Sequence, residues 1–185
     1  MTPPNGERYA VRSVGNDPAE ETERSMGKKP AETPLDRAKR LATEYLRNPH
    51  SEKELRDRLR EKAVSDADIE TVTALCLDYG FLNDADYAGM IVRHYAARGY
   101  GAGRIRQELL RRGVPKDLWD EAMTEFLPTP DDTLDRLLAA RLRGKDASDR
   151  RERDKAANYL FRRGYAWSDI RAALDRYGAA DDLYE

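Results

Sequence analysis

The sequence predicts an all-α protein: an elongated tandem array of three three-helix repeats behind a disordered N-terminal tail. Charged residues make up 37% of the 185 residues yet nearly cancel, with 33 Lys and Arg against 35 Asp and Glu. Long charged side chains favour helices with hydrated outer faces. Apolar residues recur at helical spacing from Leu35 onward, with no sustained alternation of the kind that predicts a strand. Glycines, prolines and capping residues divide this pattern into segments.

The first 32 residues have a different composition from the rest. They contain four of the chain's prolines and no leucine, mixed with charged residues. Such a stretch cannot bury enough apolar area to offset the entropy lost on ordering. We therefore predict a disordered polar tail over residues 1–32, with a partner-binding motif as the alternative. A second, short tail is expected at residues 179–185.

The first repeat is predicted over residues 33–82. Thr33 suits a helix N-cap, and Ser51 with Glu54 forms a capping box in which each side chain satisfies a backbone donor. Ser65 is placed to open a third helix, which Gly80 is placed to end. The apolar positions of these three helices are Leu35, Ala38, Leu41, Ala42, Tyr45, Leu46, Leu55, Leu59, Ile69, Val72, Leu75, Cys76 and Tyr79.

The second and third repeats are predicted over residues 83–128 and 129–178. In the second, helices are expected to end at Gly99 and Gly113, and Pro115 to open the last helix. In the third, the segment 129–132 resembles a helix start, and Gly164 and Gly178 are placed to end helices.

The repeats come into register when the chain is shifted by about fifty residues. Leu59 then meets Leu109, and a further shift of fifty-one residues brings Leu109 to Leu160 and Gly113 to Gly164. Caps, glycines and apolar positions agree together, which favours true repetition over the chance self-similarity of any helical chain. When helical units of this kind stack, they bury apolar surface that a single unit alone leaves largely exposed.

Basic residues gather at matching positions of the second and third repeats, although the net charge is only −2. Arginine binds phosphates and carboxylates through paired hydrogen bonds, so these helices predict a surface for DNA backbone or for an acidic protein; the alternative is a solvated face with internal ion pairs. Neighbouring Tyr100 and Tyr165 are expected to pack rather than to stack on bases. The predicted partner-binding residues are Arg104, Arg106, Arg111, Arg112, Arg150, Arg151, Arg153, Lys155, Arg162 and Arg163.

No set of residues predicts catalysis, a cofactor or a metal site. The glycine-rich segment 99–103 follows no strand and is interpreted as a connection between helices, unlike a phosphate-binding loop. Ser51 and Ser168 are interpreted as caps, and His94 as a packed histidine. Asp84 and Asp86 are interpreted as acids of a first helical turn. Trp119 and Trp167 are expected in the core or between repeats.

The cellular setting is predicted from what the sequence contains. No apolar run approaches the roughly 20 residues needed to span a bilayer, and the N-terminus lacks the apolar core of a signal peptide. The one cysteine, Cys76, has no partner within the chain. We expect a cytoplasmic monomer that does not bind membranes.

The order and spacing of several short stretches resemble the RecX family, the regulatory proteins of the RecA recombinase. The segment from Gly80 to Ala88 is the most distinctive, and the resemblance extends from about Leu35 to Tyr177. The N-terminal tail lies outside it, and the connection from Gly144 to Asp149 matches poorly. The stretches are Ser51-Glu52-Lys53-Glu54-Leu55, Gly80-Phe81-Leu82-Asn83-Asp84-Ala85-Asp86-Tyr87-Ala88, Gly103-Arg104-Ile105-Arg106-Gln107-Glu108-Leu109, Arg112-Gly113-Val114 and Leu160-Phe161-Arg162-Arg163-Gly164-Tyr165.

The resemblance implies a non-enzymatic protein without a cofactor that binds RecA filaments on single-stranded DNA. Members of the family inhibit filament growth, ATP hydrolysis, strand exchange and co-protease activity, and so limit recombination and the SOS response. Two other functions stay open from the residues alone. One is direct binding of single- or double-stranded DNA without RecA, which a sequence pI near 5.9 disfavours. The other is a helical scaffold for unrelated proteins.

Overall fold

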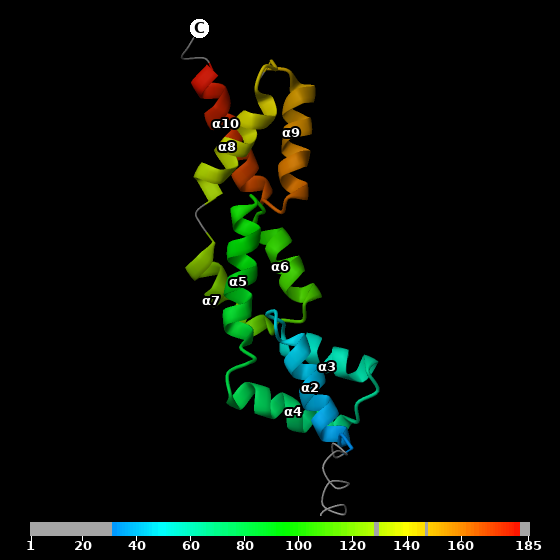
Figure 1. Ribbon diagram of the computed structural model, residues 1–185. Coiled ribbons are helices and arrows are strands. Elements are labelled where there is room, and N and C mark those ends of the chain that lie inside the picture. The colour runs from blue at the N-terminus through cyan, green and yellow to red at the C-terminus, as the bar shows by residue number, and fades with distance from the viewer. Residues whose placement is uncertain (1–30, 128–129, 147, 182–185) are drawn as a thin grey trace, which may run out of the picture. The chain divides into compact units, whose positions relative to one another are not determined.

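A computed structural model describes residues 31–127, 130–146 and 148–181 of the chain (Figure 1). These residues form nine α-helices, one short 3₁₀ helix and no strand, in three groups of three. The predicted all-α fold of three three-helix repeats is confirmed. The predicted N-terminal tail lies outside the described residues, apart from residues 31 and 32.

The first group forms as its capping residues predict. Ser51 caps α3 within a complete capping box, and Thr33 and Ser65 accept hydrogen bonds from the first turns of α2 and α4. Leu55, Leu59, Ile69 and Val72 are fully buried in a core of this group's own. The bounds are α2 Pro34–Tyr45, α3 Glu52–Glu61 and α4 Asp66–Asp78.

The second group differs slightly from the prediction at its last helix. Pro115 precedes a 3₁₀ turn, η1, and the α-helix itself begins only at Trp119. The indole nitrogen of Trp119 donates to the Val114 carbonyl at 3.0 Å, and the ring packs against the group's core as expected. The bounds are α5 Asp84–Ala97, α6 Ala102–Arg111, η1 Lys116–Leu118 and α7 Trp119–Phe126.

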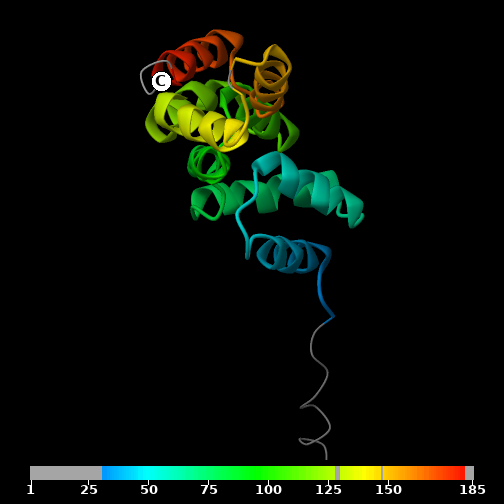
Figure 2. The same ribbon diagram turned by 90° about the horizontal axis from the view of Figure 1, so that it is seen from above.

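The third group corrects two predictions about helix ends. Ser168 lies inside the first turn of α10, where its hydroxyl bonds Asp169, so it is not the cap. Gly178 does not end α10, which continues to Asp181. Seen from above, α8 lies beside both α9 and α10 (Figure 2). The bounds are α8 Pro130–Leu142, α9 Arg150–Arg162 and α10 Trp167–Asp181.

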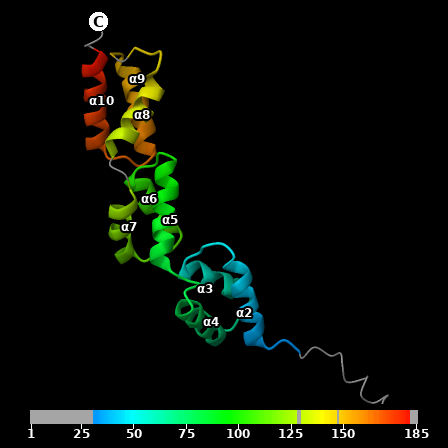
Figure 3. The same cartoon turned by 60° about the vertical axis from the view of Figure 1, so that its left-hand side comes forward.

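The middle helices α3 and α6 join the first group to the second (Figure 3). The hydroxyl of Ser51, at the start of α3, donates to the carbonyl of Arg112, at the end of α6, at 2.6 Å. Gly113 follows with a φ of 70°, and a Cβ there would overlap the side chain of Lys53. The start of α3, which is the positive end of its helix dipole, therefore meets the end of α6, which is the negative end of its dipole.

The second and third groups join in the same way. The amide of Gly101, at the start of α6, donates to the carbonyl of Arg163, at the end of α9, at 2.9 Å. The amide of Gly103 donates to the carbonyl of Gly164, also at 2.9 Å. A Cβ on Gly164 would overlap the backbone of Arg104, so this junction needs the close approach that glycine permits.

The two outer ends of this series are built differently from the junctions. At the end of α3 the equivalent carbonyl, that of Lys62, accepts a hydrogen bond from Arg37 at 2.9 Å. Ala63 follows with a φ of 54°, where the other two groups have glycine. At the other end, α9 has 13 residues against 10 in each of α3 and α6, and the additional residues stand at its start.

Candidate partner-binding surface

Five basic side chains occupy related positions on α6 and α9, and we call them the basic stripe. The fifty-one-residue shift that superposes Leu109 on Leu160 also brings Arg104 to Lys155 and Arg111 to Arg162. Arg151 lies one helical turn before Lys155, on the same side of α9. The basic stripe consists of Arg104, Arg111, Arg151, Lys155 and Arg162, all of them exposed.

The first repeat carries the opposite charge at the equivalent positions. A shift of fifty residues brings Glu54 to Arg104 and Glu61 to Arg111. Glu61 forms an ion pair with Arg58 at 3.0 Å. The basic stripe is therefore a property of the second and third repeats and is absent from α3.

A buried carboxylate on α6 pairs with two arginines at the end of that helix. Glu108 is only 4% exposed and accepts hydrogen bonds from Arg111 and, at 2.8 Å, from Arg112. The bond from Arg111, with that from Arg112, lowers the Glu108 pKa to about 2 against the opposing effect of burial. Arg111 stays 65% exposed despite this pair, so it remains available to a partner.

Arg112 is committed to the junction between the first two groups. Its guanidinium donates to the hydroxyl of Tyr87, and that hydroxyl donates to Glu54 at 3.0 Å. Burial raises the Tyr87 pKa to about 12. Because Glu54 belongs to α3 and Tyr87 to α5, this network links two groups within the protein and leaves Arg112 only 29% exposed.

Arg163 plays the corresponding part at the second junction. It donates to the carbonyls of Arg98 at 2.7 Å and Gly99 at 3.0 Å, and its guanidinium lies 5.0 Å from the ring centre of Tyr100. Tyr165 is buried and donates to the Gly99 carbonyl at 3.3 Å. Both tyrosines are packing residues, as predicted.

The basic residues of α9 divide between two sides of that helix. Arg151 and Arg162 form no ion pair within the described residues. Lys155 shares Glu152 with Lys145, and these two lysines lower the Glu152 pKa to about 2. Arg150, Arg153, Ala157 and Phe161 follow one another along the other side of α9. Arg106 lies apart from the basic stripe, 3.9 Å from Asp120.

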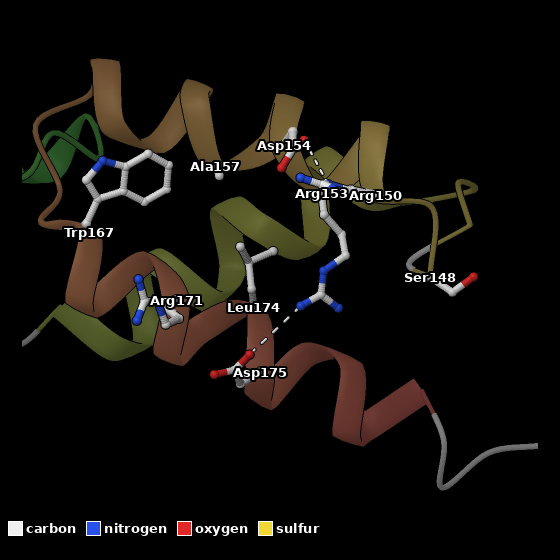
Figure 4. A pocket seen from close by; sticks show the side chains of 9 residues that line it. All are labelled: Ser148, Arg150, Arg153, Asp154, Ala157, Trp167, Arg171, Leu174 and Asp175. Atoms are coloured by element: carbon white, nitrogen blue, oxygen red, sulfur yellow. Dashed lines mark ion pairs between the residues drawn. The ribbon is translucent and has the colours of Figure 1, made fainter.

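The second side of α9 and α10 enclose an open groove of about 430 Å³ (Figure 4). Neither Arg171 nor the pairing of Phe161 with Trp167 was predicted from the sequence. These two rings stack 5.5 Å apart at an angle of 21°, and each is about half exposed. Trp167 was predicted in the core or between repeats, but it lies half exposed within the third group. The groove, called the α9–α10 groove, is lined by Ser148, Arg150, Arg153, Asp154, Ala157, Trp167, Arg171, Leu174 and Asp175.

His94 is a further correction, because its side chain is exposed rather than packed in the core. The described residues contain no cluster of His, Cys, Asp and Glu able to hold a metal ion. Cys76 is buried and free. In the same part of the chain, no helix is long and apolar enough to cross a membrane.

Three family models match the chain in the order in which the helix groups occur. The first three-helix domain of RecX matches residues 38–74, the second residues 83–123 and the third residues 130–174. Each match falls within one of the three groups described above.

Relatives and solved structures agree with this match. The chain is 37% identical over 141 residues to "Regulatory protein RecX" of Vibrio campbellii, covering 74% of this chain and 89% of the relative. It is 31% identical over 142 residues to that of Xanthomonas axonopodis pv. citri, covering 77% and 86%. The crystal structure of RecX from Lactobacillus salivarius shares the fold, with a TM-score of 0.70 at 19% identity over 77% of this chain and 96% of that one.

Proposed function

This chain belongs to the RecX family of regulatory proteins, and on that premise we propose that it is a negative regulator of RecA. It binds the RecA filament on single-stranded DNA and inhibits ATP hydrolysis, strand exchange and co-protease activity. It has no catalytic activity of its own and acts as a cytoplasmic monomer. The observation that carries the proposal is the family match across all three helix groups.

The basic stripe is the proposed contact surface. Its five side chains are exposed and recur on α6 and α9, and they face either acidic RecA surface or the DNA backbone. The other predicted contact residues differ in availability, because Arg112 and Arg163 are held in the junctions. Binding that favours an inactive filament state shifts the filament population by its differential affinity for that state.

The test is the DNA-dependent ATPase of RecA with this protein titrated in. Arg104→Glu with Arg162→Glu reverses two exposed charges of the basic stripe, and the expected result is a roughly tenfold weaker inhibition, equal to about 1.4 kcal/mol. Arg47→Glu with Lys116→Glu is the matched control, because both residues are exposed and lie outside the basic stripe. The difference between the two variants should shrink at high salt.

Each result separates one part of the proposal from the rest. Wild-type protein without effect on the ATPase overturns the regulatory function. A folded stripe variant that inhibits like wild type overturns the contact surface. Tight binding to naked DNA with a steep salt dependence, and no requirement for RecA, supports direct DNA binding instead.

A further inference from the structure

We propose that the α9–α10 groove docks an acidic segment of a protein partner that carries a large apolar side chain. The groove is distinct from the basic stripe, because Arg150, Arg153 and Phe161 lie on a different side of α9 from Lys155 and Arg162. It would thus add a second contact to the proposed regulatory surface, and it rests on the proposed function only for the identity of the partner.

The walls of the groove supply the positive charge. Arg150 is 94% exposed and lies 3.9 Å from Asp154, and Arg153 lies 3.9 Å from Asp175 across the groove (Figure 4). Arg171, on α10, forms no ion pair with any described residue. Arg153 is 33% exposed and Asp175 70%, and ion pairs of this length near the surface contribute little to stability. The arginines can therefore exchange these carboxylates for those of a partner at small cost.

The floor and one end of the groove supply the apolar surface. Ala157 from α9 and Leu174 from α10 line the floor. The stacked rings of Phe161 and Trp167 extend this surface at the start of α10, about half exposed. Contiguous apolar surface rimmed by polar residues is typical of interaction sites, and Trp and Arg are among the residues that most often dominate protein–protein affinity.

The charge pattern favours a protein segment over a nucleic acid. Two carboxylates, Asp154 and Asp175, line the same groove as the three arginines, and the chain as a whole carries a net charge of −2. A nucleic acid places a phosphate at every step along such a surface. A peptide can instead alternate carboxylates, which meet the arginines, with an apolar side chain, which meets Trp167.

Trp167 reports directly on the groove, because the chain has only two tryptophans. In a Trp119→Phe variant, emission comes from Trp167 alone. Adding RecA filaments assembled on single-stranded DNA should shift this emission to shorter wavelength, whereas poly(dT) alone should leave it unchanged. If Trp119→Phe does not fold, the difference between the emission of wild type and of Trp167→Phe gives the same signal.

Arg150→Glu with Arg171→Glu tests the charged walls, and the control is Arg47→Glu with Lys116→Glu. The groove variant should bind filaments about tenfold more weakly with the helix content of wild type, while the control binds normally. Filament binding without any change at Trp167, or normal binding by the groove variant, overturns the proposal. A response of Trp167 to poly(dT) alone also overturns it, in favour of nucleic acid. Inhibition of RecA by wild type in the same preparation shows whether the proposed function survives.

Discussion

The hydroxyl of Ser51 donates to the carbonyl of Arg112, 61 positions away, at 2.6 Å. The same hydroxyl accepts from the amide of Glu54 at 3.1 Å, so one buried serine caps α3 and ties it to α6. A residue identified from the sequence by its local role therefore also holds two helix groups together.

Ser51→Ala should lower the free energy of unfolding by about 2 kcal/mol, because it removes both the cap and the junction bond. Ser65→Ala is the matched control. Ser65 caps α4 in the same way but is exposed and bonds only Asp68, so about 1 kcal/mol is expected. Urea unfolding monitored by circular dichroism gives both values. Equal losses would show that the junction bond contributes nothing.

Substitutions at three equivalent positions should change the free energy of unfolding in opposite directions. Ala63, Gly113 and Gly164 all have positive φ, a conformation that costs a residue with a Cβ about 1–2 kcal/mol. Ala63→Gly should therefore stabilise the protein by up to about 1 kcal/mol. Gly113→Ala should destabilise it, and Gly164→Ala more so, because there the added Cβ meets the backbone of Arg104 rather than a flexible lysine.

Thermal unfolding of the three variants under one buffer condition checks this order. A loss of stability in Ala63→Gly, or a neutral Gly164→Ala, would contradict the difference between the outer end of the series and its junctions. Gly144→Ala is a useful reference, since Gly144 has a φ of 70° with open space around it. Its cost is therefore that of the backbone conformation alone.

Lowering the pH should reduce the free energy of unfolding, because Glu108 becomes protonated. Its pKa is about 2 in the folded chain and near 4.3 when unfolded, so the stabilisation is complete above about pH 5 and is lost as the pH falls toward 2. Glu108→Gln should lower the free energy of unfolding by about 2 kcal/mol at pH 7. In this variant the free energy of unfolding should also fall less than in wild type as the pH is lowered from 5 to 2.

Glu152→Gln provides the comparison for this pH dependence. Glu152 also has a pKa of about 2, through Lys145 and Lys155, but its side chain is 19% exposed, against 5% for that of Glu108. Its contribution should fade in 1 M NaCl, where the screening length is about 3 Å, while that of Glu108 persists. Denaturant titrations at several pH values and two salt concentrations measure both effects, and an equal salt response would contradict the assigned burial of Glu108.

Thr73→Val should stabilise the protein by about 1 kcal/mol. The Thr73 hydroxyl is fully buried and has no hydrogen-bond partner among the described residues, and an unpaired buried polar group costs about 1–3 kcal/mol. Thr73→Ser keeps the hydroxyl and removes the methyl group, so it should destabilise. Chemical unfolding distinguishes the two, and a loss of stability in Thr73→Val would mean that the hydroxyl is in fact satisfied.

Local signals made the helices predictable from the sequence. Thr33, Ser51 and Ser65 each accept a hydrogen bond from the amide three residues ahead, so their roles are visible in a short stretch of sequence. Gly113 and Gly164 were likewise recognisable as helix ends. Their second role is to admit the Lys53 side chain at Gly113 and the Arg104 backbone at Gly164. It depends on residues about sixty positions away and leaves no local trace.

The candidate surface was less predictable, because neighbouring arginines go to different places. Arg111 and Arg112 are adjacent and identical in type, yet one remains exposed while the other joins Tyr87 and Glu54 in a junction. Helical spacing also placed His94 on the apolar stripe, although it lies at the edge of that stripe and faces solvent. Only the packing of one group on the next decides such cases.

The outer end of the first module differs from the two junctions in ways that would hinder the docking of another module. Arg37 already occupies the Lys62 carbonyl that a preceding module would need, and the Cβ of Ala63 stands where glycine admits a neighbour at the junctions. At the opposite end, α9 begins one turn earlier than α3 and α6 do relative to their junctions. A further module that docked at the first end as the described modules dock on one another would therefore have to displace Arg37 and meet the Cβ of Ala63.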